Sequence, residues 1–216
     1  MWNLPNIITL ARILITPVIA LLPFIDGYWP KVVCFIVFLV AVISDIVDGV
    51  LARRNNQITD LGKLLDPIAD KLLLLATLIP IYFISQERKD LYDSPIWGSI
   101  PMWVCLLLLG REFAMTVFRW WAQRRGVIIA AAGPGKLKNA FQSIFIAAIF
   151  GWFAFRDAIK PMGWEKSAFA RFWTDFHGGF VTITLAVAVV LTVWSFVVYI
   201  HRYRDLFSSA STDRPK

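Results

Sequence analysis

Four aspartates occur as two pairs within residues 44–71, at the ends of stretches that are otherwise apolar. Asp45 and Asp48 are three residues apart, and Asp66 and Asp70 are four residues apart. On a helix, either spacing places both members of a pair on one face. Because the segment between the pairs is short, we expect two antiparallel neighbouring helices whose four carboxylates converge on one small volume.

Carboxylates gathered in a poorly solvated place cannot all stay ionised unless cations accompany them. Oxygen ligands with no histidine or cysteine nearby favour hard divalent cations such as Mg²⁺ or Mn²⁺ over zinc. Because Mg²⁺ usually completes its coordination with substrate phosphates, the pattern predicts a phosphate-bearing substrate. The alternative is a purely structural set of ion pairs with the neighbouring cations Arg53, Arg54, Lys63 and Lys71.

Small residues between the two aspartate pairs would leave room for a ligand. Gly49 and Ala52 lie on the polar side of the first helix, where neither side chain would obstruct a molecule crossing the backbone. Arg53 could clamp a phosphate of that ligand. Gly62 allows a tight entry to the second helix, and the fifth aspartate, Asp60, is expected to be a solvated loop residue or a helix cap.

The aspartates and these small residues together resemble the signature of the CDP-alcohol phosphatidyltransferases, matched at Asp45, Asp48, Gly49, Ala52, Arg53, Gly62, Asp66 and Asp70. The resemblance implies a bundle of six transmembrane helices that often forms a homodimer. It also implies two divalent ions, Mg²⁺ or Mn²⁺, held by the first three aspartates, with the fourth, Asp70, as general base. The donor would be CDP-diacylglycerol, bound at Gly49, Ala52 and Arg53, with membrane lipid around it.

A second group of charges, on later helices, suits the phosphate of an acceptor. Arg111 and Arg119 are eight residues apart on one helix face, and Lys136 and Lys138 follow at the start of the next helix. The chain resembles the bacterial branch of the family that makes phosphatidylglycerol phosphate over most of residues 4–145, above all at residues 5–17, 52–71, 111–119 and 135–142. That resemblance implies glycerol 3-phosphate as acceptor.

Other readings of the second group stay open. An acceptor such as inositol phosphate would also need cations, and phosphatidylglycerol is a further alternative within the family. Arg111 could instead form a structural ion pair with a carboxylate on a neighbouring helix.

A divalent-cation transporter is an alternative from another class of protein. Such a transporter would carry acidic residues at several depths of the membrane, whereas the aspartates of this chain gather at one face. No nucleic-acid partner is expected.

The helices that position these residues are predicted to be membrane spans. The chain has 216 residues, of which 58% are hydrophobic and 17% charged, a composition typical of an integral membrane protein. Stretches of the ~20 apolar residues that a span needs lie near 6–25, 31–52, 64–84, 97–121, 139–155 and 178–200. We therefore predict an all-α integral membrane domain over residues 1–205 and a polar C-terminal tail over 206–216.

Two further stretches bear on the site and on the membrane boundary. Thr9 and Arg12 share one face of the first span. Arg12 either extends to the headgroups as an interfacial cation or helps to bind an anionic substrate. Residues 156–177 mix aromatic and charged side chains, which suits a segment lying at the membrane interface.

Cation placement predicts the orientation of the spans. With six spans, both termini and the second and fourth loops share one side, which carries Arg53, Arg54, Lys63, Arg124, Arg125, Lys136, Lys138, Arg202, Arg204, Arg214 and Lys216. The other side carries Lys31, Arg88, Lys89, Arg156, Lys160, Lys166 and Arg171. The positive-inside rule therefore favours cytoplasmic termini and a cytoplasmic active site, in a multi-pass protein of a bacterial inner membrane.

Overall fold

The computed structural model describes residues 4–54, 60–89, 92, 98–127 and 133–204, without the side chains of residues 5, 48–54, 60–61, 63–64 and 133–134. The predicted tail, 206–216, lies outside these residues. The described part folds into six α-helices: α1 (Leu4–Leu21), α2 (Tyr28–Arg54), α3 (Asp60–Glu87), α4 (Met102–Arg124), α5 (Gly133–Ile159) and α6 (Ala168–Arg202). Two short 3₁₀ helices, η1 (Leu22–Phe24) and η2 (Trp164–Lys166), lie in the connections before α2 and α6.

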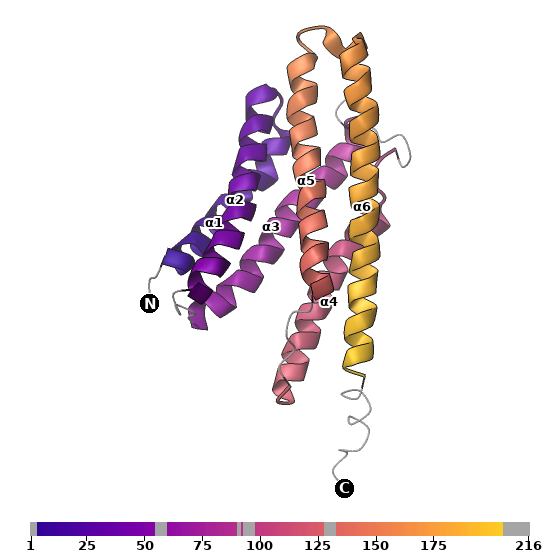
Figure 1. Cartoon of the computed structure of the whole chain (residues 1–216). Coiled ribbons are helices and arrows are strands. Elements are labelled where there is room, and N and C mark those ends of the chain that lie inside the picture. Colours follow the sequence, from indigo (N-terminus) through magenta and orange to yellow (C-terminus); the bar gives the residue numbers. More distant parts are fainter. Residues whose placement is uncertain (1–3, 55–59, 90–91, 93–97, 128–132, 205–216) are drawn as a thin grey trace.

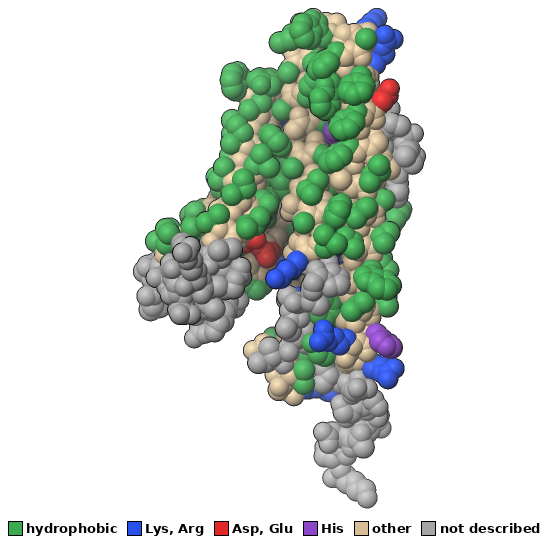
Figure 2. Space-filling model, in the orientation of Figure 1, with side chains coloured by type: hydrophobic (Ala, Val, Ile, Leu, Met, Phe, Trp, Pro, Cys, Tyr) green, Lys and Arg blue, Asp and Glu red, His purple; other side chains and the backbone are tan. Residues whose placement is uncertain are grey.

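The expected all-α membrane architecture is confirmed. Five helical stretches are long and apolar enough to span a membrane, namely Asn6–Phe24, Tyr28–Val47, Leu65–Glu87, Gly135–Ile159 and Ala168–Arg202. The exception among the described helices is α4, the predicted span near 97–121, which carries Arg111 and Glu112 at its middle and Arg119 in its last turns. Large apolar side chains cover much of the visible surface (Figure 2). Such a surface would be unusual in a soluble protein, and lipid tails suit it.

The last helix is longer than the predicted span 178–200, because it begins at Ala168. Its start has a physical cause: the Ser167 hydroxyl accepts a hydrogen bond from the Ala170 N–H, 3.1 Å away, and so caps the first turn. Residues 168–177, which we expected at the membrane interface, are therefore the first turns of α6. At 1.5 Å per residue, the 35 residues of α6 extend for about 52 Å, well beyond a hydrocarbon core of about 30 Å.

The helices pack as two neighbouring groups, α1 to α3 and α4 with α6, which α5 joins (Figure 1). In the first group α1 packs against α2 and α3, and α5 then packs against both α2 and α6. At the α2–α5 contact the Phe38 and Phe150 rings meet edge to face, with centroids 5.6 Å apart. At the α5–α6 contact the His177 ring stacks on Trp152 and hydrogen-bonds the Ala148 carbonyl oxygen over 3.1 Å. This arrangement leaves the start of α1 and the end of α2 at the same end of the molecule.

Candidate active site

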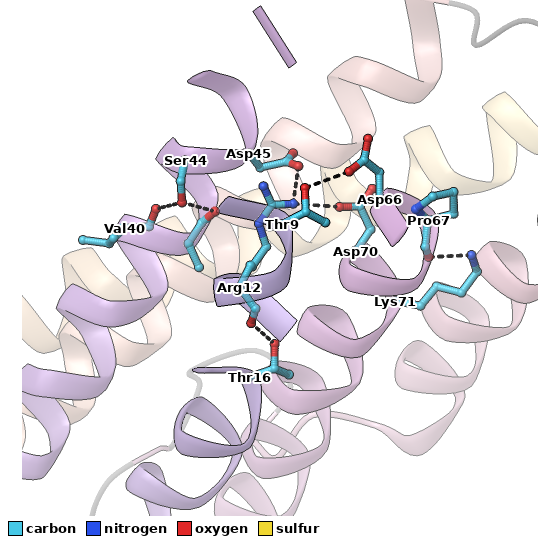
Figure 3. Close-up of polar contacts among 11 residues, drawn as sticks. Thr9, Arg12, Thr16, Val40, Ser44, Asp45, Asp66, Pro67, Asp70 and Lys71 are labelled. Carbon is cyan, nitrogen blue, oxygen red and sulfur yellow. Dashed lines mark hydrogen bonds and ion pairs between the residues drawn. The ribbon is translucent and has the colours of Figure 1, made fainter. Parts of the chain in front are cut away.

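Three helices bring Asp45, Asp66 and Asp70 together around Arg12 and Thr9 (Figure 3). The Arg12 guanidinium, on α1, forms an ion pair with Asp45 of α2, and its Nη1 lies 3.6 Å from Oδ1 of Asp70 on α3. One turn earlier, the Thr9 hydroxyl donates a hydrogen bond to Oδ1 of Asp66 over 3.0 Å. Both members of the second aspartate pair are thus held by α1, a partner that the spacing within residues 44–71 does not reveal.

The α1 residues of this cluster are buried, whereas the aspartates of α3 are exposed. Arg12 is 2% exposed and Thr9 is 1% exposed, whereas Asp66 and Asp70 are exposed. Because Arg12 is buried and ion-paired, it does not occupy the exposed interfacial position that was one reading of the sequence. A buried guanidinium is costly unless charge partners and hydrogen bonds accompany it, so the carboxylates of Asp45 and Asp70 stabilise it and are oriented by it in turn.

The remaining residues of the aspartate motif are placed only in part. Asp48, Gly49, Ala52 and Arg53 belong to the last turns of α2, but their side chains lie outside the described residues, so their assignments stay predictions. Gly62 lies in the first turn of α3, which begins at Asp60.

The alternative in which nearby cations only neutralise the aspartates can be examined for one of its four cations, Lys71. The side chains of the other three, Arg53, Arg54 and Lys63, lie outside the described residues. The Lys71 ammonium donates to the Pro67 carbonyl oxygen over 2.8 Å and is close enough to Asp70 to interact with it electrostatically. In the described part, the cation that contacts the aspartates directly is Arg12 of α1.

The carboxylates form an all-oxygen donor set, which suits a hard divalent cation. Asp70 interacts electrostatically with both Asp45 of α2 and Asp66 of its own helix. Among the described residues, no three His, Cys, Asp or Glu side chains already stand in a metal-binding arrangement. The carboxylates suit a divalent ion by the chemistry of their oxygen atoms, while in this structure Arg12 supplies the positive charge between Asp45 and Asp70.

The second cluster is organised by Glu112, a residue that the sequence analysis did not single out. Glu112 Oε1 accepts hydrogen bonds from Arg111 Nη1, 2.8 Å away, and from the Lys138 ammonium of α5. Arg111 Nη2 also donates to the Ser195 hydroxyl of α6 over 2.9 Å. Three helices thus converge on this cluster, and the carboxylate that Arg111 contacts belongs to its own helix rather than to a neighbouring one.

The four predicted acceptor residues fall into two kinds of position. Lys138 is 1% exposed and Arg111 is largely buried, whereas Arg119 and Lys136 are exposed. The structure therefore brings together Arg111 and Lys138 and leaves Arg119 and Lys136 at the surface. One signal for Glu112 was available in the sequence, since an acidic residue beside Arg111 in an apolar stretch needs a partner. Ser195 offered no comparable signal.

The two clusters are neighbours in space. Lys71, next to Asp70 on α3, interacts electrostatically with Glu112 and Arg119 of α4, and Lys138 interacts with both Arg111 and Arg119. Figure 2 shows acidic and basic side chains close together at a surface that is otherwise largely hydrophobic. An anionic substrate held by the aspartate cluster and its cations would therefore lie near a second group of cations.

Comparison with known proteins covers almost the whole of this architecture. The family model for CDP-alcohol phosphatidyltransferase matches residues 2–194. A Mycobacterium tuberculosis protein named probable phosphatidylglycerophosphate synthase is 34% identical over 208 residues, covering 94% of this chain and 83% of the relative. Two proteins named CDP-diacylglycerol–glycerol-3-phosphate 3-phosphatidyltransferase also match.

The first of these two, from Bacillus subtilis, is 35% identical over 161 residues, covering 69% of this chain and 77% of the relative. The second, the isoform numbered 2 from Arabidopsis thaliana, is 30% identical over 204 residues, covering 93% of this chain and 79% of the relative. The family match includes the residues of both clusters except Ser195, because it ends at residue 194.

Proposed function

The chain belongs to the CDP-alcohol phosphatidyltransferase family, and we propose that it transfers a phosphatidyl group from CDP-diacylglycerol to glycerol 3-phosphate. The products are phosphatidylglycerol phosphate and CMP. The observation that carries this proposal is the pairing of a carboxylate cluster with a buried cation pair, Arg111 and Lys138, around Glu112. The relatives named for the same donor and acceptor support the choice of glycerol 3-phosphate.

The donor end of the reaction belongs to the aspartate cluster. Two divalent ions, Mg²⁺ or Mn²⁺, held by Asp45, Asp48 and Asp66, would neutralise the diphosphate of CDP-diacylglycerol and the departing CMP. Gly49 and Ala52 leave space beside this diphosphate, and Arg53 pairs with it.

Asp70 is the proposed general base. It accepts the proton of the glycerol 3-phosphate hydroxyl as that oxygen forms its bond to the phosphatidyl phosphorus and the bond from phosphorus to the CMP oxygen breaks. Arg12 holds the Asp70 carboxylate from one side, with Nη1 and Oδ1 3.6 Å apart. Thr9 orients Asp66 in the same way through its hydroxyl. Both α1 residues are therefore positioning residues in this proposal.

The acceptor end belongs to the Glu112 cluster. Arg111 and Lys138 would bind the phosphate of glycerol 3-phosphate, and the exposed Arg119 and Lys136 would guide it from the surface. Glu112 keeps the two buried cations close together before the acceptor arrives. A phosphorylated acceptor uses this arrangement, whereas an acceptor without a phosphate has no need of it.

The protein is a multi-pass membrane protein. We further propose that it works as a homodimer in a bacterial inner membrane, with its active site and both termini in the cytoplasm. The distribution of Lys and Arg between the two predicted sides supports this orientation.

An acceptor screen tests the function. The purified full chain, in lipid vesicles with CDP-diacylglycerol and Mg²⁺, is given glycerol 3-phosphate, inositol phosphate or phosphatidylglycerol, and the release of CMP is measured. We expect CMP release with glycerol 3-phosphate alone, its loss when EDTA is added, and its recovery with Mg²⁺ or Mn²⁺. An absence of CMP release with glycerol 3-phosphate would rule out the proposed reaction. Uptake of divalent cations by the same vesicles would support a transporter instead.

A further inference from the structure

A pocket of about 350 Å³ lies at the opposite end of the bundle from the aspartates. Its charged lining residues are Asp26 before α2, Arg88 after α3, and Asp157 and Lys160 at the end of α5. Each of these segments follows or precedes a membrane span: the spans end at Phe24, Glu87 and Ile159, and the next begins at Tyr28. The pocket therefore opens where the bundle meets the boundary of the membrane, and the proposed reaction does not use it.

Asp157, which lines the pocket, has a buried carboxylate oxygen that lacks a hydrogen bond. The Asp157 side chain is 10% exposed and lies 3.6 Å from the Lys31 ammonium, measured from Oδ2 to Nζ. Within the described part of the chain, Asp157 Oδ2 accepts no hydrogen bond, and the Lys31 ammonium donates to the Ile25 carbonyl oxygen. A buried acceptor left without a donor is destabilising. The position thus suits a ligand that brings an N–H or O–H group.

The rest of the lining carries both signs of charge. Arg88 Nη1 pairs with Asp26 Oδ1 at 2.8 Å, and both side chains reach solvent. Lys160 adds a second cation at the rim of the pocket. Two carboxylates and two cations complement a ligand that is itself zwitterionic, with a phosphate for the cations and a positive group for the carboxylates.

Aromatic side chains place the pocket at the depth of lipid headgroups. Tyr28 lines it and is 41% exposed, and its neighbour Trp29 is 71% exposed. Trp164, which follows the end of α5, is 56% exposed. Tyr and Trp concentrate at the two membrane–water interfaces, where their rings lie among the headgroups. The molecules most abundant at the mouth of this pocket are therefore membrane phospholipids.

We propose that this pocket binds the headgroup of an aminophospholipid, with the primary ammonium donating to Asp157 Oδ2 and the phosphate lying against Arg88 and Lys160. A primary ammonium satisfies Asp157 with a charged N–H donor and is also attracted by Asp26. A trimethylated ammonium has the same charge but no N–H, and a glycerol headgroup has O–H donors but no positive charge. The site thus distinguishes three headgroups by one hydrogen bond and one charge.

Lipid-dependent stability and binding test the proposal. The full chain, delipidated in detergent, is mixed with phosphatidylethanolamine, phosphatidylcholine or phosphatidylglycerol of identical acyl chains, and the thermal midpoint and apparent Kd are measured. One charged hydrogen bond corresponds to about tenfold or more in affinity. We therefore expect phosphatidylethanolamine to bind at least about tenfold more tightly than phosphatidylcholine and to raise the midpoint more than either other lipid.

Variants assign the effect to the pocket. Asp157→Asn should remove the preference for phosphatidylethanolamine over phosphatidylcholine, and Lys160→Gln should weaken the binding of both lipids. Asp175→Asn, an exposed position on α6, is the matched control and should keep the preference. If Asp157→Asn fails to fold, Lys160→Gln and Tyr28→Ala still test the pocket. Equal effects of phosphatidylcholine or phosphatidylglycerol, no effect of any lipid, or a preference that survives Asp157→Asn would each overturn the proposal.

Discussion

Arg12 has its guanidinium buried between carboxylates of two other helices, Asp45 on α2 and Asp70 on α3. At the scale of single residues, this position gives Arg12 a double effect. It compensates the mutual repulsion of the carboxylates, and it fixes the direction in which Asp70 points. The proposed base is therefore exposed to substrate on one side and held by a buried cation on the other.

Asp70→Asn is expected to separate catalysis from metal binding. Asparagine keeps the shape of the side chain but cannot accept the hydroxyl proton, so kcat should fall by about 10²–10⁴-fold. The binding of Mn²⁺, followed by electron paramagnetic resonance, should change little, because Asp45, Asp48 and Asp66 are the proposed ligands. Asp175→Asn, at an exposed position in the first turns of α6, serves as the control and should retain normal turnover. A parallel loss of Mn²⁺ binding would instead make Asp70 a metal ligand.

Arg111→Gln is expected to act on the acceptor and not on the donor. Loss of a charged hydrogen bond to phosphate costs about 1.5–3 kcal/mol, which raises the KM for glycerol 3-phosphate about tenfold or more. The KM for CDP-diacylglycerol should stay unchanged. The matched control is Arg124→Gln, since Arg124 is exposed and its guanidinium lies 3.6 Å from the ring centroid of Trp120.

The same variant also tests the structural reading of Arg111, which contacts Glu112 and Ser195. If Arg111 serves only to join α4 to α6, the thermal midpoint should fall while both KM values stay unchanged. Measuring stability beside kinetics therefore distinguishes the two roles.

Among the helix contacts, the packing of α2 against α5 holds α2 and its aspartates in position. Gly151 of α5 faces the Phe35 ring of α2, and a Cβ built at Gly151 would lie 3.4 Å from Phe35 Cε2. That distance is an ordinary van der Waals contact, so one methyl group can be accommodated. A larger side chain has no such space unless α2 and α5 move apart.

Two substitutions at Gly151 should therefore differ in their effect on the free energy of unfolding. Gly151→Ala should be neutral or stabilise by up to about 1 kcal/mol, because alanine is the better helix former. Gly151→Leu should destabilise by about 1–3 kcal/mol through overpacking against Phe35. Thermal unfolding in detergent measures both effects. Gly179→Leu is the control, because a Cβ at Gly179 of α6 meets no atom within 4 Å. A stable Gly151→Leu variant would contradict this account of the contact.

At the scale of the whole molecule, the charged features are divided between the two ends of the bundle. Asp45 lies toward the end of α2, Asp70 toward the start of α3 and Lys138 toward the start of α5, so both proposed substrate clusters share one end. The pocket with Asp157 lies at the other end. If both proposals hold, the protein reacts with lipid at one membrane surface and binds a headgroup at the other.

Single added cysteines test this orientation in intact cells. We expect Lys166→Cys, in η2, to react with a membrane-impermeant maleimide from outside, and Gln123→Cys, near the end of α4, to react only after permeabilisation. Both positions are exposed. The unsubstituted chain is the control, because its cysteines, Cys34 and Cys105, are 1% and 9% exposed and should label weakly. The opposite labelling pattern would place the active site outside the cytoplasm.

The sequence alone determined the class of fold, the family and the proposed chemistry of the aspartates. These depend on local properties: the length of an apolar stretch decides whether it can span a membrane, and a spacing of three or four residues decides which side chains share a helix face. The helix ends were less predictable. The start of α6 depends on the cap at Ser167, which a search for apolar residues does not detect.

The tertiary structure alone decided the partners of the charged residues. Arg12 could have reached the headgroups, yet it pairs with Asp45 and Asp70 on other helices. Glu112 gained its role only when α5 brought Lys138 to it, and Asp157 became a candidate binding residue only when Lys31 and the pocket formed around it. Helical periodicity tells which way a side chain faces, but the neighbour that it meets depends on how separate helices pack.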